Sequence, residues 1–150
     1  MDAKYLKAEG LCKTYGKVKA LDQVDLTLEP GHIYGLIGRN GAGKTTLLAA
    51  LTAQLPVDQG RVTYGGEPVW ENDKVLADLC FSRELSGKLG TSVNSLRVRD
   101  YLKAGQLFYP HWDDAYAHRL TAQFGLQEKK RISALSKGMM SAVTIVLALA

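Results

Sequence analysis

Hydrophobic and polar residues alternate over the first part of the chain, which is the pattern of half-buried β-strands. Residues 5–15 and 20–28 form two such runs, and Gly16-Lys17 lies at the turn between them. Within the second run the letters V-D-L-T-L place apolar side chains on one face and polar side chains on the other. The pattern predicts two antiparallel strands.

Short apolar runs of strand length follow, separated by turn-forming residues. The first run, residues 32–37, comes after Pro30-Gly31 and leads into residues 45–55, whose Leu and Ala content favours a helix. Gly65-Gly66 then separates two shorter runs, as in a hairpin. We expect a loop at 56–60, hairpin strands at 61–64 and 68–70, and a further strand within 75–82.

From Val98 onward the apolar residues recur at helical spacing. This spacing predicts helices over residues 98–108, 113–124 and 136–150. Pro110 and Gly125 are expected to end the first two helices, and Ser136 is a suitable N-cap for the third. The Gly- and Ser-rich residues 86–94 before them are expected to form a loop.

The composition is that of a globular domain with its own core. The chain has 150 residues, of which 46% are hydrophobic and 23% are charged. Its net charge of +4 is modest, and its lysine clusters lack interleaved aromatic side chains. We therefore expect a solvated surface and no nucleic-acid partner.

Cysteine usage and the apolar stretches indicate a cytoplasmic protein. Cys12 and Cys80 fall within expected strands, so we expect buried free thiols and a reducing compartment. The N-terminal residues M-D-A-K-Y-L-K lack the apolar core of a signal peptide. The longest apolar stretch, residues 142–150, is too short to span a bilayer.

The motif with the clearest chemistry is a glycine-rich loop between the apolar run 32–37 and the first expected helix. Glycines let the backbone turn with positive φ, so that successive N–H groups point into one concavity. The start of the helix adds further N–H groups and the positive end of its dipole. The loop reads G-R-N-G-A-G-K-T, a full match to G-x-x-x-x-G-K-[ST], over Gly38, Arg39, Asn40, Gly41, Ala42, Gly43, Lys44 and Thr45.

Three side chains at the end of this loop have specific roles in binding a nucleoside triphosphate. Lys44 brings a mobile full charge to the β- and γ-phosphates, and the Thr45 hydroxyl can ligate Mg²⁺. Thr46 completes the expected ATP-binding segment. The sequence therefore predicts a nucleotide-binding P-loop.

A second motif, L-S-K-G-M, occupies Leu135, Ser136, Lys137, Gly138 and Met139. With the P-loop, it makes the chain resemble the ATP-binding subunits of ABC transporters over essentially its whole length. The family's signature is L-S-G-G-Q, so Lys137 replaces a glycine and Met139 a glutamine. The resemblance implies that Ser136 and Gly138 contact the γ-phosphate of ATP held by the partner subunit. The alternative role of Ser136 is that of an ordinary helix cap.

The resemblance also implies roles for residues outside the two motifs. Tyr15 in K-T-Y-G-K-V-K-A-L matches the aromatic residue that stacks on adenine, with packing on the core as the alternative. The family's Mg²⁺-contacting glutamine has no counterpart in F-S-R-E-L, where Arg83 or Glu84 takes its place. Of these two, only Glu84 could accept a hydrogen bond from a metal-bound water.

The family's catalytic residues follow the signature helix, and this sequence contains none of them up to Ala150. Missing are the Walker B aspartate, the catalytic glutamate and the switch histidine. The chain thus resembles the N-terminal portion of such a subunit, and no catalytic residue can be nominated. We expect the full-length protein to be an ATPase and these 150 residues alone to hydrolyse ATP negligibly.

The fold implied by the resemblance is α/β, a P-loop NTPase domain of the ABC type. It would combine an antiparallel β subdomain, a partial parallel core sheet and a helical subdomain. We expect residues 1–85 to form the β-rich and P-loop part, 86–135 the helical subdomain and 136–150 the signature helix.

The function implied is ATP binding and hydrolysis that drive transport, with ATP and Mg²⁺ as ligands. The expected partners are a transmembrane permease subunit and a second ATP-binding subunit, identical or not, on the cytoplasmic face of the membrane. The departures from the family's motifs, together with F-Y-P-H-W-D-D at residues 108–114, resemble a bacterial exporter-type subgroup. Alternatives are a soluble ABC-type ATPase acting on ribosomes or DNA, and a binding-only fragment. The transported substrate and its direction stay open, because the membrane subunit carries that specificity.

Overall fold

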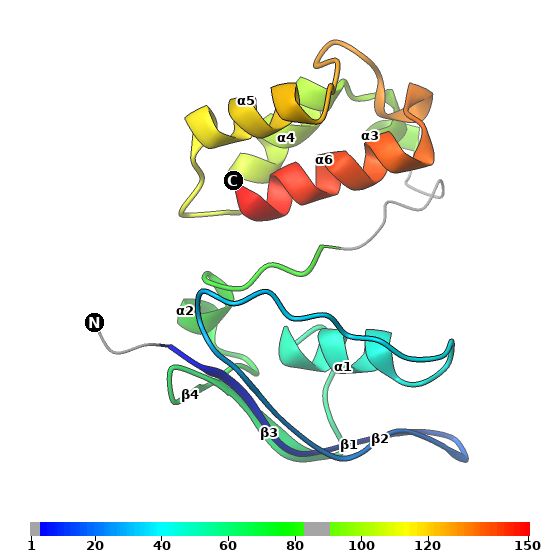
Figure 1. Cartoon of the computed structure of the whole chain (residues 1–150). Coiled ribbons are helices and arrows are strands. Elements are labelled where there is room, and N and C mark those ends of the chain that lie inside the picture. The colour runs from blue at the N-terminus through cyan, green and yellow to red at the C-terminus, as the bar shows by residue number, and fades with distance from the viewer. Residues whose placement is uncertain (1–3, 83–90) are drawn as a thin grey trace. The chain divides into compact units, whose positions relative to one another are not determined.

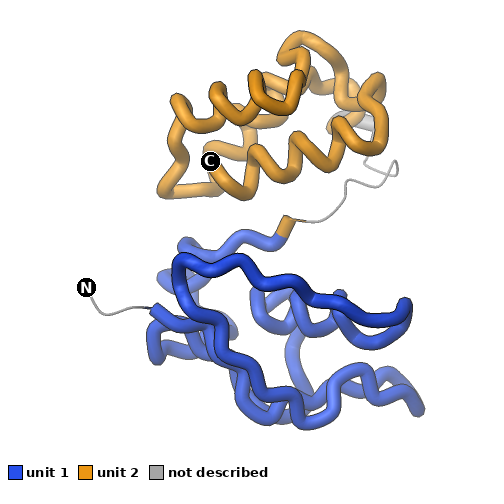
Figure 2. The backbone as a smooth tube through the Cα atoms, in the orientation of Figure 1, with its two compact units in different colours: residues 1–81 blue, residues 82–150 orange. Residues whose placement is uncertain are grey.

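The computed structural model describes residues 4–82 and 91–150, and the chain divides into two compact units (Figure 2). The first unit spans residues 1–81 and the second residues 82–150. Each unit has a separate hydrophobic core, so the packing of each follows from its own residues.

The first unit is built on a four-stranded antiparallel sheet with the strand order β2-β1-β3-β4 (Figure 1). The strands are β1 (Leu6–Tyr15), β2 (Val18–Leu28), β3 (Gln59–Tyr64) and β4 (Glu67–Pro68). The two strands predicted from alternation are confirmed, and so is the hairpin predicted around Gly65-Gly66. β1 is central because it pairs with both β2 and β3.

Helix α1 (Lys44–Leu51) covers one face of this sheet (Figure 1). The helix was predicted to reach Leu55, but it ends at Leu51 because Ala53 has a φ of 52°, outside the right-handed helical region. The buried core of this unit joins apolar side chains of α1, β1 and β2: Ala8, Leu11, Leu21, Leu47, Ala50 and Leu51.

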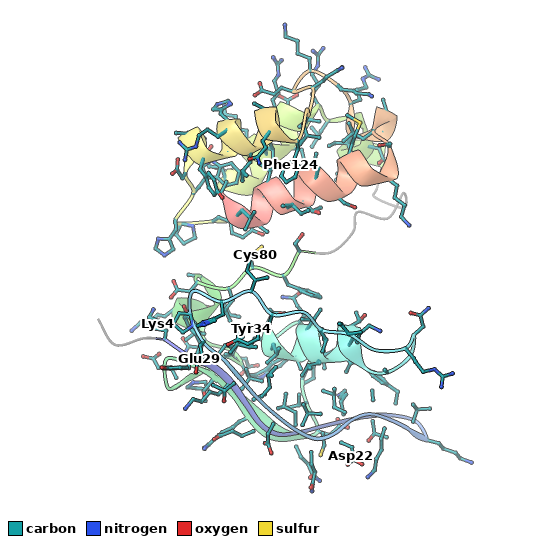
Figure 3. All side chains as sticks on the ribbon, viewed as in Figure 1. Lys4, Asp22, Glu29, Tyr34, Cys80 and Phe124 are labelled. Carbon is teal, nitrogen blue, oxygen red and sulfur yellow. The ribbon has the colours of Figure 1, made fainter. Side chains whose placement is uncertain are left out.

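Residues 32–37 are not a strand, although their composition predicted one. They pair with none of the described strands, and Ile33 and Ile37 are 103% and 95% exposed. Tyr34 instead turns back locally, and its hydroxyl accepts a hydrogen bond from the Glu29 N–H at 3.0 Å (Figure 3). An apolar run becomes a strand only where a neighbouring strand satisfies its backbone groups. The paired strands within the described residues are all antiparallel, so the expected parallel sheet is not among them.

The strand predicted within residues 75–82 is also wrong. Helix α2 (Asp73–Leu76) forms there instead, because the Asn72 side chain accepts a hydrogen bond from the Val75 N–H at 3.4 Å and caps its start. Cys80 therefore lies outside any strand, whereas Cys12 lies in β1. Both cysteines are free, as predicted, but they are half-buried rather than buried.

The second unit is helical. Its elements are α3 (Thr91–Ser95), α4 (Val98–Gln106), α5 (Asp114–Gln123), the 3₁₀ turn η1 (Ile132–Ala134) and α6 (Lys137–Leu149). The three helices predicted from periodicity are confirmed. The loop predicted over residues 86–94 is wrong for residues 91–94, which belong to α3, and its remainder lies outside the described residues.

The core of this unit lies between α4, α5 and α6. It buries nine apolar side chains: Val98, Leu102, Ala117, Leu120, Leu126, Ile132, Leu135, Val143 and Val146. The helix ends follow from local capping. The Asp113 side chain accepts a hydrogen bond from the Tyr116 N–H at 2.9 Å, and Gly125, with a φ of 62°, follows the end of α5.

No helix in the described part of the chain is both long enough and apolar enough to cross a membrane.

The end of β1 is joined to the loop before β3 by one residue, Asp58. Its N–H donates to the Cys12 carbonyl at 2.9 Å. Its carboxylate accepts hydrogen bonds from Lys13 Nζ at 2.9 Å and from the Thr14 N–H at 2.7 Å. The Lys13 ammonium, followed by the Thr14 N–H, lowers the pKa of the Asp58 carboxyl below its ordinary value of 3.8.

Further along the same strand pair, β3 approaches β1 too closely for a side chain. Gly60 has a φ of 86°, and a Cβ atom there would overlap the carbonyl oxygens of Glu9 and Gly10. The register of the two strands shifts between Glu9 and Cys12, so the glycine accommodates this irregularity. Gly66, in the hairpin, has a similar φ of 88° but open space around the Cβ position.

We predict that replacing glycine with alanine lowers the free energy of unfolding by different amounts at Gly60 and Gly66. Gly66→Ala should lower the free energy of unfolding by about 1 kcal/mol, from the left-handed backbone alone. Gly60→Ala should lower it by about 3 kcal/mol or more, because overlap with two backbone carbonyls is added. Denaturant unfolding of the two variants measures the difference, and equal losses would contradict the close approach of β3 to β1.

The lowered pKa of Asp58 predicts how the first unit responds to acid. Because the folded-state pKa lies below the unfolded one, the Asp58 bonds contribute stability above the ordinary value of 3.8, and this contribution is lost as the pH falls through the folded pKa. Asp58→Asn should therefore flatten the dependence of unfolding free energy on pH between about 5 and about 2. If unfolding free energy depends on pH equally in Asp58→Asn and in the unsubstituted protein, the Asp58 carboxylate is not bound to Lys13 and Thr14 in solution.

Candidate nucleotide-binding site

The P-loop, residues 38–45, connects the extended segment 32–37 to α1. Its turn is closed by the Ala42 N–H, which donates to the Arg39 carbonyl at 3.1 Å. Gly41 and Gly43 have φ values of 83° and 85°, in the left-handed region that glycine tolerates. The expectation that the motif's glycines supply positive φ is met at these two positions.

Gly43 is constrained by its neighbours as well as by its backbone. A Cβ atom there would overlap the carbonyl oxygen of Ala20 in β2, so only glycine lets the loop lie directly on the sheet. Gly43 is also the N-cap of α1, and it offers no side chain to the first N–H groups of the helix. These N–H groups and the positive end of the helix dipole are therefore available for an anion.

Lys44 folds back over the loop that precedes it. Its Nζ donates to the carbonyl oxygens of Gly38 at 2.6 Å and Arg39 at 2.8 Å. The ammonium is thus held at the P-loop by neutral acceptors. Phosphate oxygens would bind it more strongly, because their negative charge adds a Coulombic attraction that neutral carbonyl oxygens lack.

The predicted P-loop residues form one continuous segment, in which Gly43 and Lys44 are half-buried. Arg39, Asn40, Gly41 and Ala42 are exposed, Thr45 is exposed and Thr46 is half-buried in the first turn of α1. Mg²⁺ in nucleotide sites commonly takes one or two protein oxygens and completes its shell with phosphate and water. The single Thr45 hydroxyl fits that pattern. No group of three or more His, Cys, Asp or Glu side chains in the described residues forms a separate metal site.

Tyr15, the predicted adenine-stacking residue, is the last residue of β1. The residue is 51% exposed and is not packed in the core, so a planar base can approach it. Lys13 Nζ lies 5.9 Å from the ring centre. No sequence motif indicates Lys13 or Asp58, because the contacts between them join residues far apart in the chain.

The signature residues lie in the second unit, at the start of α6. The Ser136 hydroxyl oxygen accepts a hydrogen bond from the Met139 N–H at 3.3 Å, which is the helix-cap role weighed as an alternative. The Ser136 hydroxyl hydrogen can still donate to a further acceptor. Leu135 is buried and Met139 half-buried in the helical core, whereas Lys137 and Gly138 are exposed.

Arg83 and Glu84, the candidates for the position of the family's glutamine, lie outside the described residues.

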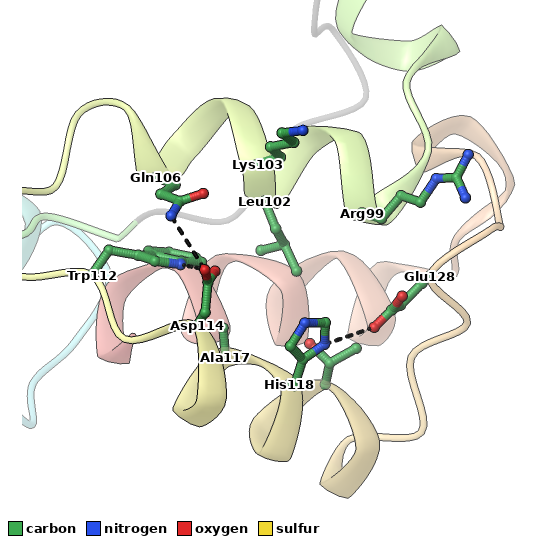
Figure 4. A pocket seen from close by; sticks show the side chains of 10 residues that line it. Arg99, Leu102, Lys103, Gln106, Trp112, Asp114, Ala117, His118 and Glu128 are labelled. Atoms are coloured by element: carbon green, nitrogen blue, oxygen red, sulfur yellow. Dashed lines mark hydrogen bonds and ion pairs between the residues drawn. The ribbon is translucent and has the colours of Figure 1, made fainter.

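The second unit also contains a hollow of about 280 Å³ between α4 and α5 (Figure 4). Asp114 accepts hydrogen bonds from Trp112 Nε1 at 2.7 Å and from Gln106 Nε2 at 3.5 Å. His118 Nδ1 lies 3.1 Å from Glu128 Oε1. These interactions hold α4, α5 and the following loop together. No sequence motif indicates this hollow, because it arises from helix packing.

Comparisons with known proteins agree with the two motifs. The family model for ABC transporters matches residues 21–150. The ABC transporter ATP-binding protein YtrB of Bacillus subtilis is 29% identical over 140 residues, which are 93% of this chain and 47% of YtrB. The xylose import ATP-binding protein XylG of Pseudomonas syringae is 35% identical over 106 residues, which are 71% of this chain and 20% of XylG. The chain therefore spans about half of YtrB and a smaller part of XylG.

Solved structures share the fold. A protein of Pyrococcus furiosus described as an ABC transporter ATP-binding protein has a TM-score of 0.77 at 26% identity, covering 95% of this chain and 68% of that protein. The ADP conformation of MJ1267, an ATP-binding cassette of an ABC transporter, has a TM-score of 0.74 at 26% identity, covering 97% of this chain and 64% of MJ1267. The predicted α/β fold of the ABC type is confirmed.

The family match is not limited to the P-loop, which many unrelated nucleotide-binding proteins share. It runs from β2 through the P-loop, the helical unit and the signature helix, with the motifs in the expected order. The chain belongs to the ABC transporter family.

Proposed function

We propose that this protein is the ATP-binding subunit of an ABC transporter, which binds MgATP and hydrolyses it to drive transport. The observation that carries the proposal is the start of α1. Its first N–H groups have no side-chain cap, and the Lys44 ammonium is bound only to loop carbonyls. A triphosphate supplies the negative charge that both groups lack.

Nucleotide binding would rearrange few protein groups. The N–H groups of the P-loop and of the first turn of α1 bind the β-phosphate region, and Lys44 exchanges the Gly38 and Arg39 carbonyls for phosphate oxygens. Mg²⁺, held by the Thr45 hydroxyl and the phosphates, would neutralise charge that develops during phosphoryl transfer. Tyr15 offers its exposed ring to the adenine base.

The signature residues serve the ATP of a second ATP-binding subunit. The N–H groups at the start of α6 and the remaining donor of Ser136 would contact the γ-phosphate, and the exposed Gly138 leaves room for it. Lys137, in the place of a family glycine, would add a cation. Two subunits would then enclose two ATP molecules.

The further partner is a membrane-spanning permease subunit, which places the protein on the cytoplasmic face of the membrane. Several relatives are named as import ATP-binding proteins, for xylose, fructose and ribose. The segment L-R-V-R-D-Y-L, at residues 96–102, resembles the part of the family that meets the membrane helices, and it forms the start of α4.

Hydrolysis requires carboxylates that the 150-residue sequence does not provide at the family's positions. We therefore propose that residues 1–150 alone bind nucleotide without appreciable turnover. Phosphate release from these residues above background, abolished by Lys44→Ala, would contradict this.

The P-loop interpretation predicts a ligand effect on stability. MgATP at about a hundred times its dissociation constant should stabilise the protein by about 2.7 kcal/mol. Lys44→Ala should remove most of this stabilisation, whereas Lys74→Ala, an exposed lysine on α2, should retain it. Thermal melts with and without MgATP measure both effects. An equal melting shift in the Lys44 variant would exclude the P-loop as the binding site.

The shared ATP site predicts complementation between inactive variants of the complete protein. Lys44→Ala subunits lack a working P-loop, and Ser136→Ala subunits lack a signature donor, so each alone should show background ATPase activity. In an equal mixture about half the dimers carry one intact site of two, so about a quarter of the wild-type activity should return. Melting curves of each variant check that it folds, since Ser136→Ala also removes a helix cap. Absence of recovery with folded variants would contradict the shared site in a dimer of identical subunits.

A further inference from the structure

Asp58 lies in the first unit, close to the residue expected to stack on the base. Tyr15 is the last residue of β1, and the residues immediately before it, Cys12 to Thr14, are each bound to Asp58. We propose that Asp58 is a positioning residue for nucleotide binding, which acts through Lys13 and the Thr14 backbone to orient the Tyr15 ring toward the base. This inference rests on the proposed function, which places the base against Tyr15.

The geometry around Asp58 leaves it little freedom. Its N–H is bound to the Cys12 carbonyl, one carboxylate oxygen accepts from Lys13 Nζ and the other accepts from the Thr14 N–H, all within 2.9 Å. Three successive residues of β1 are thus fixed by one residue of a different loop. Two of these bonds hold backbone groups of β1, the Cys12 carbonyl and the Thr14 N–H. They therefore fix the path of the backbone that leads to Tyr15.

The β1–β2 pairing reaches the end of this strand, where Tyr15 lies opposite Val18, but it is irregular just before that end. Its register shifts between Leu11 and Lys13 and again between Lys13 and Thr14. Such irregularities break the regular ladder and change the local twist. Asp58 binds residues 12–14 in this irregular stretch and so supports it from the β3 side.

Lys13 connects the Asp58 carboxylate to the tyrosine ring. Lys13 Nζ lies 5.9 Å from the centre of the Tyr15 ring, within the range of a cation–π contact. The Lys13 side chain is only 15% exposed, so its ammonium is confined between the carboxylate and the ring. Removing the Asp58 charge would release the ammonium and loosen the ring.

The consequence for binding concerns the base and not the phosphates. The phosphates are held by residues 38–46, whereas Asp58 contacts residues 12–14. A comparison of two ligands separates these effects: ATP carries both base and phosphates, and inorganic tripolyphosphate carries phosphates alone. A residue that orients the Tyr15 ring should therefore alter the affinity for ATP and leave the affinity for tripolyphosphate unchanged.

The experiment measures the affinity of the complete protein for ATP and for tripolyphosphate, each with Mg²⁺, by titration calorimetry. Asp58→Asn keeps an oxygen acceptor for the Thr14 N–H but removes the charge that holds Lys13. We expect it to weaken ATP binding about three- to fivefold and to leave tripolyphosphate binding unchanged. Tyr15→Ala should weaken ATP binding more, by about five- to a hundredfold, with the same selectivity.

Two further variants test the route through Lys13. Lys13→Met keeps the apolar stem and removes the ammonium, so it should match Asp58→Asn, and the double variant should be no weaker than either single one. Glu9→Gln is the matched control. It breaks the ion pair between Glu9 and Arg61, which also joins β1 to β3 but contacts none of these residues, and it should leave both affinities unchanged.

The outcomes distinguish this inference from the proposed function. If Tyr15→Ala changes neither affinity, the base contact assigned to Tyr15 is wrong, and the proposed binding mode fails with it. If Tyr15→Ala weakens ATP binding selectively but Asp58→Asn does not, the positioning role is overturned while the function stands. Equal losses for both ligands in Asp58→Asn would also overturn it, because they would mean that Asp58 supports the fold of the whole unit.

Discussion

The chemistry of the first unit centres on the first turn of α1, whose N–H groups have no side-chain cap. Two glycines in the left-handed region, Gly41 and Gly43, turn the chain so that the helix begins without a side-chain cap. Gly43 also lies against the Ala20 carbonyl, which fixes the loop to the sheet. Unpaired N–H groups at a helix start are unfavourable unless water or an anion satisfies them. The loop geometry therefore leaves these N–H groups available to an anion.

The sheet serves this site by holding two of its parts in place. β2 carries the carbonyl against which Gly43 lies, and β1 ends at Tyr15. Both strands share a core with α1, so the phosphate-binding loop and the exposed tyrosine belong to one packed unit. Asp58 adds a support where the strand pairing is irregular.

The helical unit presents a helix start of a different kind. Ser136 caps α6, while Leu135 and Met139 bind the motif to the core. Buried apolar neighbours on both sides leave Lys137 and Gly138 exposed. The cap uses the oxygen of the serine and leaves its hydrogen, which is why a structural and a ligand-binding role are compatible.

Elements that depend on local information could be predicted from the amino-acid sequence alone. Alternation predicted β1 and β2, helical spacing predicted α4, α5 and α6, and the P-loop and signature motifs indicated the family. Residues 32–37 do not form a strand although their composition favours one, because a strand requires a neighbouring strand to pair with. The presence of that neighbour depends on the tertiary structure and not on the segment's own sequence. Helix α2 likewise forms where apolar residues predicted a strand, because the Asn72 side chain caps its start. The contacts of Asp58 with residues 12–14 could not be predicted from the sequence either, because they join two segments that come together only when the sheet forms.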